Sequence, residues 1–313
     1  MMLTWKLFKR INIAGEAIDN PVYLREIECY PVWYAAAQHV NRISVLRVGL
    51  GSLGGLACIL GMLYVNNLLF LLVPPLIVLM AATGLTLGPI IARERVSLNW
   101  PLLMVIPDGV EEVLINKAAG ALAWIRNLLS VMIILLGTAA IGVGLGSLAL
   151  LPTGRGLTPN WPTTLLCGVL LTLPTVTAFI YIVDRAQQYV LIITSALAAG
   201  ASSTSVPASI IGASIATAAI WALEIVTTGL VLLVQPGSID FTNSTTLLTL
   251  ITLGPMPSYI MQLDMARAVV YIALTLAVRE LLIRAVWRYT VQRARSEAGE
   301  GGLEHPLRRL ISH

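Results

Sequence analysis

The chain has 313 residues, of which 57% are hydrophobic and only 12% are charged. Soluble domains carry about 25% charged residues, so this composition excludes an ordinary soluble domain and predicts an integral membrane protein. The net charge of +4 does not indicate nucleic-acid binding, because the basic residues gather at the ends of apolar runs and form no basic stripe with interleaved aromatic residues.

The residues that carry catalytic or metal chemistry are few. Cys29, Cys58 and Cys167 are far apart, and no two of the three histidines have a metal-binding spacing. The chain contains no Walker-type GxxxxGK[ST] motif and no grouping of serine, histidine and carboxylate residues. We therefore expect no metal site, no cofactor and no enzymatic activity, and any ATP would be hydrolysed by another chain.

The first 44 residues predict a cytosolic N-terminus that contains an interfacial helix. Asn20-Pro21 is a favourable helix start, with Asn as the cap and Pro at the first helical position. The helix is expected to lie in the membrane interface rather than to span it. One face would hold Tyr23, Ile27, Tyr30 and Tyr34, and Arg25, Glu26 and Glu28 would lie away from that face.

Apolar runs long enough to span a bilayer, about 20 residues each, follow one another along the rest of the chain. Two further runs, 188–204 and 245–262, are ambiguous: the first is short and ends in a polar cluster, and the second contains the helix-breaking Gly254-Pro255-Met256-Pro257. Asp184-Arg185 is interpreted as a short charged loop. The six clear runs are 45–65, 68–91, 126–151, 163–183, 206–234 and 265–286.

The distribution of basic residues predicts the topology. Seventeen of the twenty lysines and arginines lie in 1–47, 92–126 and 279–309, which marks these segments as cytosolic. An even number of crossings must then separate them. We expect an all-α, polytopic transmembrane helix bundle in a prokaryotic plasma membrane, with both termini cytosolic and six core spans, or eight if both ambiguous runs cross. The transmembrane domain would cover 45–290, with an outer re-entrant segment at 236–262 and a cytosolic tail at 291–313.

A charged interruption between the second and third spans, residues 92–121, predicts a short helix beneath the membrane. Asp108 and Glu111 have the spacing of a capping box, and Glu111, Glu112 and Lys117 match the helix dipole. Physical chemistry alone indicates an interfacial helix and does not name a partner. The apolar stripe of this helix would comprise Val110, Val113, Leu114, Ala118 and Ala121.

The order of residues in this loop resembles the cytosolic loop of type-2 ABC exporter permeases. The residues that carry the resemblance are Glu94-Arg95, Trp100, Leu102-Leu103, Pro107, Glu112, Lys117 and Gly120. Upstream, Asn20-Pro21 with Arg25-Glu26 is similar to the start of many members. The sequence departs from the pattern at Leu98-Asn99, where the family has a Gly-Thr pair, and at Asn116, where glycine usually precedes the lysine.

The resemblance implies a half-transporter with six spans, which pairs with a second permease subunit as a homodimer or heterodimer. It also implies a coupling helix that docks on a separate ATP-binding subunit, and a re-entrant segment between the fifth and sixth spans. The residues implied at the ATPase-docking loop are Glu94, Arg95, Trp100, Pro107, Glu111, Glu112 and Lys117.

Glu224 is an ionisable residue well inside a predicted span, and such a carboxylate is a candidate for function. It would form an intramembrane polar site, or it would be hydrogen bonded to Thr217, Thr227 or Thr228 and serve packing. Asp264 and Arg267 are interpreted as an interfacial pair. Two functions other than ABC export stay open: a non-transporting scaffold subunit of a larger membrane complex, and a secondary carrier that uses Glu224 for proton coupling.

Overall fold

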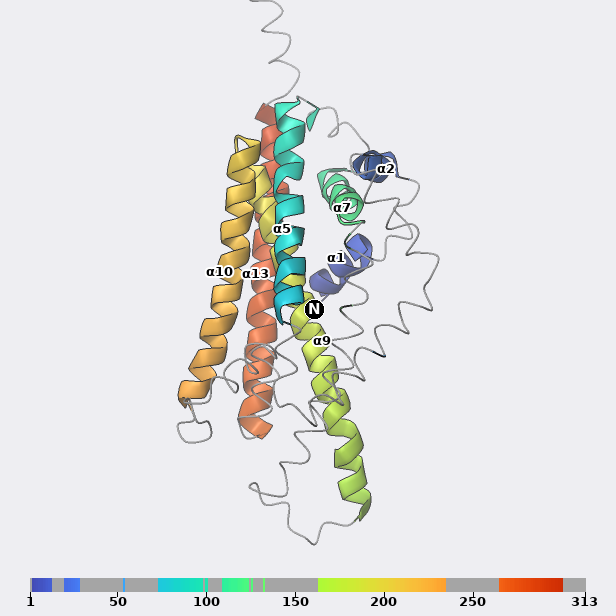
Figure 1. The fold of residues 1–313 in the computed structure, drawn as a ribbon, viewed down its shortest axis with the longest axis vertical. Helices are drawn as coiled ribbons and strands as arrows, with labels where there is room; N and C mark the ends of the chain where they lie inside the picture. The colour runs from blue at the N-terminus through green and yellow to red at the C-terminus, as the bar shows by residue number, and fades with distance from the viewer. Residues whose placement is uncertain are drawn as a thin grey trace, which may run out of the picture.

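All described residues of the chain lie in helices or in short connecting turns, and none of them is in a strand. The computed structural model describes residues 2–12, 20–28, 53, 73–97, 99–100, 109–123, 125, 132, 163–234 and 265–300. The prediction of an all-α fold is confirmed for these residues. The helices are α1 (Met2–Asn12), α2 (Pro21–Glu28), α5 (Val73–Val96), α7 (Gly109–Ala121), α9 (Thr163–Ser202), α10 (Val206–Val234) and α13 (Met265–Glu300) (Figure 1).

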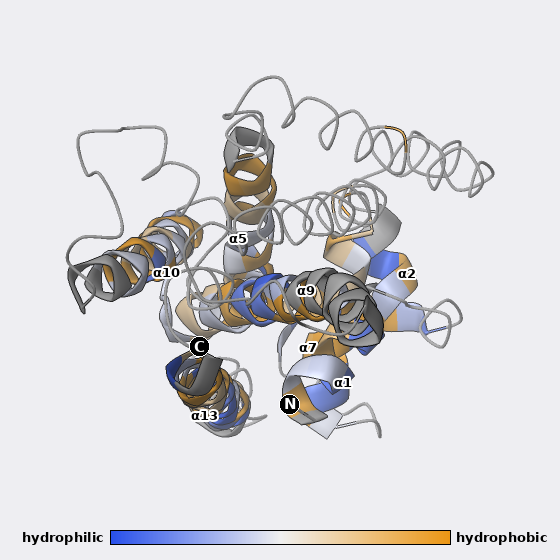
Figure 2. Ribbon diagram, turned by 90° about the horizontal axis from the view of Figure 1, so that it is seen from below, coloured by the Kyte–Doolittle hydropathy of each residue, from blue (hydrophilic) through white to orange (hydrophobic). Residues whose placement is uncertain are grey.

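Four long helices form a bundle with α9 at its centre. α9 contacts α5, α10 and α13, and α5 also contacts α10. The short helices α1, α2 and α7 lie together on the side of α9 that faces away from α10. Figure 2 shows this arrangement in a view along the bundle axis. α7 contacts both α1 and α2. The short helices therefore form a separate layer that packs against one flank of the bundle.

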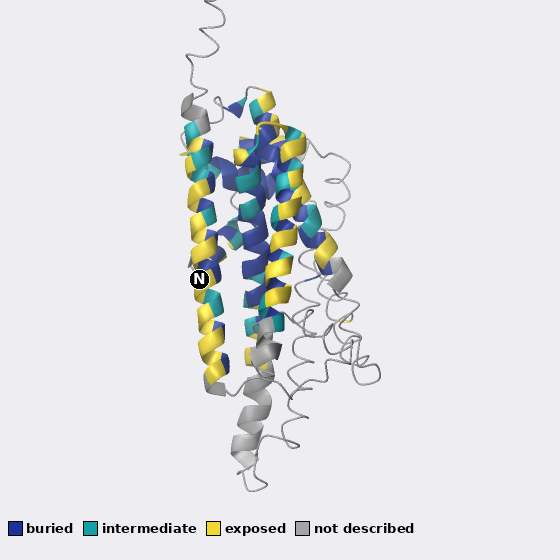
Figure 3. Cartoon of the chain, turned by 90° about the vertical axis from the view of Figure 1, so that its left-hand side faces the viewer, coloured by how far each residue is buried: buried dark blue, intermediate teal, exposed yellow. Residues whose placement is uncertain are grey.

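Two helices among the described residues are long and apolar enough to cross a membrane, namely Leu76–Val96 and Val206–Gly229. They favour membrane insertion. The second, part of α10, has a face of exposed positions (Figure 3), and several of these positions carry large apolar side chains. The six-span count stays a prediction, because the runs 45–65 and 126–151 and the segment 236–262 lie outside the described residues, apart from the single positions 53 and 132. The exposed apolar residues of α10 include Ile211, Ile215, Leu223 and Val226.

The predicted charged loop at Asp184-Arg185 is wrong. α9 runs unbroken through these residues for 40 residues, which is about 60 Å at 1.5 Å per residue. The run 188–204 is therefore one end of the same helix as 163–183, and it is not the separate crossing that an eight-span chain requires. The two charged side chains are buried against neighbouring helices, and their partners there explain why the helix need not break.

Helix α13 continues to Glu300, past residue 291 where the predicted C-terminal tail begins. Its buried positions continue at helical spacing beyond the predicted membrane boundary. The many charged residues in the last part of α13 made its amphipathic stripe difficult to recognise in the sequence. The stripe comprises Ile283, Trp287, Thr290 and Ala294, each of which is buried.

Glycines allow α5, α9 and α10 to approach closely near the α9–α10 turn. A Cβ atom added at Gly88 would lie 2.8 Å from the Cβ of Ala213 and 2.9 Å from the carbonyl oxygen of Ser209. A Cβ atom added at Gly200 would collide with the carbonyl oxygen of Gly88. Neither position has room for a side chain unless the backbones move apart.

We expect Gly200→Ala to destabilise the purified chain by about 1–3 kcal/mol, since overpacking a tight contact shifts backbone and side chains. Gly229→Ala is the matched control, because no atom lies within 4 Å of a Cβ added there and alanine favours a helix by about 1 kcal/mol over glycine. Thermal unfolding in detergent measures both. An equal midpoint for the two variants would contradict the close crossing of α5 and α9.

Candidate functional site

Helix α7 corresponds to the predicted helix of the charged interruption, but it is buried on more than its apolar stripe. Val113, Leu114, Ala118 and Ala121 are buried as expected, and Val110 is half-buried. From Val113 onward the burial of α7 extends beyond the predicted apolar stripe, because α1 and α2 pack against it. Its other buried residues are Ile115, Asn116, Lys117, Ala119 and Gly120.

Lys117 joins three helices through ion pairs and is only 1% exposed. Its Nζ lies 2.8 Å from Oε1 of Glu94 at the end of α5, and it also pairs with the carboxylate of Glu26 on α2. Nη2 of Arg25 donates to the second oxygen of Glu94 at 3.1 Å. These four residues, here named the Lys117 cluster, balance two positive charges against two negative ones.

The placement of Glu26 away from the packing face of its helix is wrong. The predicted cap is confirmed, because Oδ1 of Asn20 accepts a hydrogen bond from the backbone N–H of Val22 at 2.9 Å. From that start, Tyr23 and Glu26 face α7 and are buried. A Cβ atom at Gly120 would lie 2.7 Å from the Cβ of Glu26, so this glycine allows α2 to approach close enough for Glu26 to reach Lys117.

Two further residues of the predicted docking loop also point into the protein. Arg95 donates to the backbone carbonyls of Ser203 and Ala201, the second at 3.2 Å, and so satisfies the carbonyl end of α9. The indole Nε1 of Trp100 donates to the carbonyl oxygen of Ala294 on α13 at 3.2 Å. Both side chains fix the loop to the bundle. Pro107 lies outside the described residues.

The first turn of α7 is the part of this helix that remains open to a partner. Glu111 has 43% of its side chain exposed and lies 3.6 Å from Nζ of Lys6. Glu112 forms a two-pronged ion pair with Arg10, and the hydrogen bonds from this guanidinium lower the pKa of Glu112. Both basic residues come from α1.

The sequence reasoning missed α1. Its buried residues Thr4, Leu7 and Ile11 recur at intervals of three and four, a helical pattern that could have predicted it. α1 packs against α7, α9 and α13. It is also held at its beginning, where the hydroxyl of Thr4 donates to Glu280 of α13. The helix is thus fixed to the bundle at one end and to α7 at the other.

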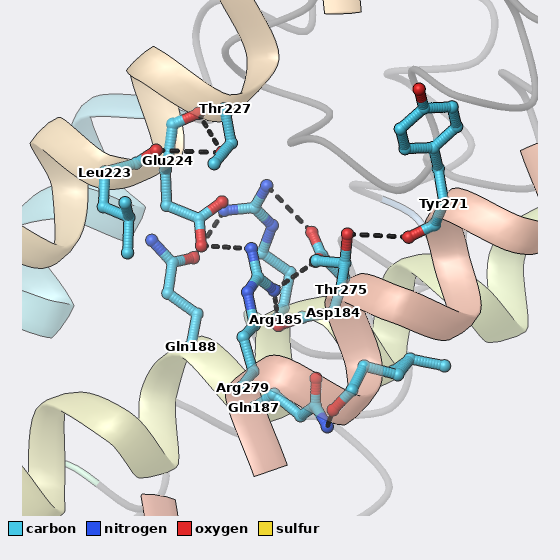
Figure 4. A network of polar contacts seen from close by, with 11 residues as sticks. Asp184, Arg185, Gln187, Gln188, Leu223, Glu224, Thr227, Tyr271, Thr275 and Arg279 are labelled. Atoms are coloured by element: carbon cyan, nitrogen blue, oxygen red, sulfur yellow. Dashed lines mark hydrogen bonds and ion pairs between the residues drawn. The ribbon is translucent and has the colours of Figure 1, made fainter. Parts of the chain in front are cut away.

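Glu224 belongs to a second buried group of charges, here named the Arg279 cluster, which consists of Asp184, Arg185, Glu224 and Arg279 (Figure 4). Arg279 of α13 pairs with both carboxylates, Asp184 on α9 and Glu224 on α10. Nη2 of Arg185 lies 3.4 Å from Oδ2 of Asp184. Like the Lys117 cluster, this group balances two charges of each sign.

The Arg279 cluster corrects one sequence-based interpretation of this region, the threonine partners of the Glu224 side chain. Arg279, at the start of the predicted cytosolic segment 279–309, is buried and only 6% exposed. The threonine partners proposed for the Glu224 side chain are wrong. Thr227 donates to the backbone carbonyls of Leu223 and Glu224, and Thr217 donates to that of Ala213. Arg267 is exposed, and Asp264 lies outside the described residues.

The chain brings Asp184 and Glu224 together because they are equally far from the turn between their helices. Asp184 lies 18 residues before Ser202, and Glu224 lies 18 residues after Val206, which is about 27 Å along each helix. Two antiparallel helices joined by a short turn place such residues at the same level. This symmetry about the turn is the signal that could have predicted the pair.

Several buried polar atoms around the Arg279 cluster have no hydrogen-bond partner among the described residues. A buried polar atom without a partner is costly, at about 1–3 kcal/mol or more for a charged group, so this region favours water or a polar ligand. The atoms are Oδ2 of Asp184, Nε and Nη2 of Arg185, Oε1 of Gln187, Nε2 of Gln188 and Oε2 of Glu224.

The described part of the chain contains no group of three or more His, Cys, Asp or Glu side chains placed to hold a metal ion. No protein-family model, curated protein or solved structure matches the chain. The described residues form a helical bundle in which two helices are long and apolar enough to cross a membrane, and buried ion pairs join a layer of short helices to this bundle.

Proposed function

We propose that the chain is the membrane-spanning permease subunit of an ABC-type exporter, which moves its substrate with ATP hydrolysed on a separate subunit. In this proposal it has six spans in a prokaryotic plasma membrane, with both termini cytosolic, and it pairs with a second permease subunit. The observation that carries the proposal is the Lys117 cluster. Glu94 and Lys117 of the loop that resembles the exporter loop meet Arg25 and Glu26, which belong to the similar N-terminal start, in one group of ion pairs.

The cluster supports a coupling role because it makes α2, α5 and α7 one mechanical unit. A displacement of α7 by a docked partner would move Lys117 and, through Glu94, the end of α5. Arg95 and Trp100 extend the same connection to α9 and α13. A chain of buried, paired groups can transmit such a displacement because packed interiors are not continuously deformable.

The geometry also refines where an ATP-binding subunit would dock. The side chains of Glu94, Arg95, Trp100 and Lys117 serve internal contacts, so we assign docking to the first turn of α7 around Glu111. The internal residues would then transmit the displacement and would not touch the partner. The exporter's substrate pathway would lie elsewhere, in the paired transmembrane bundles.

Co-purification tests this proposal. The tagged chain, extracted from its own cells with mild detergent, should bring down an ATP-hydrolysing subunit in a defined ratio. Glu111→Arg should weaken that association while leaving the thermal midpoint almost unchanged, because an exposed ion pair contributes only about 0–1 kcal/mol. Recovery of other integral membrane chains without any ATPase would contradict the proposal and favour a scaffold subunit.

A further inference from the structure

Two adjoining apolar cavities lie between α1 and the bundle. The first has a volume of about 150 Å³ and is bounded by Trp5 and Phe8 of α1, by α5, and by Tyr181 and Tyr189 of α9. The second, of about 520 Å³, opens beside it along α9. The two share Trp5, Ile182 and Ala186 in their walls, so they lie side by side as one mainly apolar region beneath α1.

The lining of this space favours a hydrocarbon occupant. Apolar cavities of about 150 Å³ stay dry and accept small apolar molecules. Trp5 and Phe8, which form its roof, stack on each other with ring centroids 6.0 Å apart. α1 is held at both ends, by Glu280 and by Glu112, so the roof is fixed. An occupant that matched the walls would be an extended chain of methylene groups.

One charged residue lines the first cavity. Arg185 is only 6% exposed, and its guanidinium lies over the Tyr181 ring at 5.4 Å from the ring centroid. Its Nη1 donates to Oε1 of Gln188 at 2.5 Å. Its Nε and Nη2 have no hydrogen-bond partner in the described part of the chain. Among the residues described, Arg279 pairs with both carboxylates of the Arg279 cluster, whereas Arg185 has one ionic contact, 3.4 Å from Nη2 to Oδ2 of Asp184, and its Nε and Nη2 make no hydrogen bond.

We infer that these cavities bind a single-chain amphiphile, with its hydrocarbon chain in the apolar space and its carboxylate head group on Nε and Nη2 of Arg185. The two guanidinium donors match the two oxygens of a carboxylate. A small inorganic anion would leave the apolar walls unfilled, and a plain hydrocarbon would leave the donors without a partner. The site does not require the exporter function.

Tryptophan fluorescence tests the inference on the purified full chain in phosphatidylcholine nanodiscs. Spin-labelled stearic acid, which quenches nearby indoles, should produce saturable quenching, and Trp5→Phe should remove most of the saturable part. The methyl ester of the same probe should bind about tenfold or more weakly, because it cannot form the charge-assisted hydrogen bonds. Equal affinity for the acid and the ester would overturn the role of Arg185.

A filling variant tests the location of the site. Ala186 lies in the wall of both cavities and is half-buried, so Ala186→Phe should abolish saturable quenching by the acid. Ala219→Phe, on the exposed face of α10, is the matched control and should leave it unchanged. Equal binding by the two variants, or quenching that never saturates in the wild-type chain, would overturn the site. The acid–ester comparison decides the matter even if Ala186→Phe does not fold.

Discussion

Replacing Lys117 by methionine is expected to lower the free energy of unfolding by about 3–5 kcal/mol, the cost of breaking a buried ion pair by removing one partner. Methionine keeps the length of the side chain and removes its charge. Glu26 and Glu94, each only 7% exposed, would then remain buried without the cation that both of them contact. Among the described residues Arg25 pairs with Glu94 and not with Glu26, so it compensates for only part of the loss. Thermal and denaturant unfolding in detergent measure the effect.

If the loss of stability comes from uncompensated buried charge, removing the two carboxylate charges as well should restore stability. Lys117→Met combined with Glu26→Gln and Glu94→Gln should recover much of the lost stability, since the uncompensated charges are gone and a neutral group costs less to bury than a charged one. Lys117→Arg should lower the free energy of unfolding by less than Lys117→Met does, because arginine keeps the positive charge. A triple variant less stable than Lys117→Met would show that packing rather than charge makes Lys117 necessary.

Arg279→Met is expected to have the other large effect, again about 3–5 kcal/mol, because it leaves Asp184 and Glu224 buried and close to each other. Asp184 is fully buried and Glu224 is 7% exposed. Arg185 remains near Asp184, so Glu224 would carry most of the uncompensated charge. The loss should be seen as a lower unfolding midpoint of the purified chain.

Glu224→Gln tests how much the contact between Arg279 and Glu224 contributes to stability within the Arg279 cluster. Glu224→Gln should be milder than Arg279→Met, because Arg279 keeps its pair with Asp184. Adding Glu224→Gln to Arg279→Met should restore part of the stability. Equal destabilisation by Glu224→Gln and Arg279→Met would contradict this account, in which the ion pairs of the Arg279 cluster hold α9, α10 and α13 together.

Sequence patterns predicted those features that depend on neighbours in the chain. The apolar run 206–234 forms one helix with the same bounds, the Asn20 cap is confirmed, and the stripe of α7 is buried. Each of these depends on spacing within a few residues. Periodicity and capping are local properties, and the sequence displays them directly.

Contacts between distant residues explain the features that were mispredicted. Asp184 and Arg185 were interpreted as a loop because charges interrupt apolar runs, but the partner that makes a helical Asp184 stable lies 95 residues away on α13. Glu26 was placed away from the apolar face of its helix by helical spacing, but its partner Lys117 is 91 residues away in the sequence. A charged residue in an apolar run indicates either a loop or a buried partner, and spacing along the chain cannot distinguish them.

Photo-crosslinking from α7 tests the central claim most directly, namely that an ATP-binding subunit docks on its first turn. A photoreactive residue at position 111 would be activated in intact cells, with position 219 on the exposed face of α10 as the control. The account predicts a covalent adduct with a soluble nucleotide-binding chain at position 111 and none at 219. An adduct at position 111 with another integral membrane chain, or no adduct there at all, would contradict it.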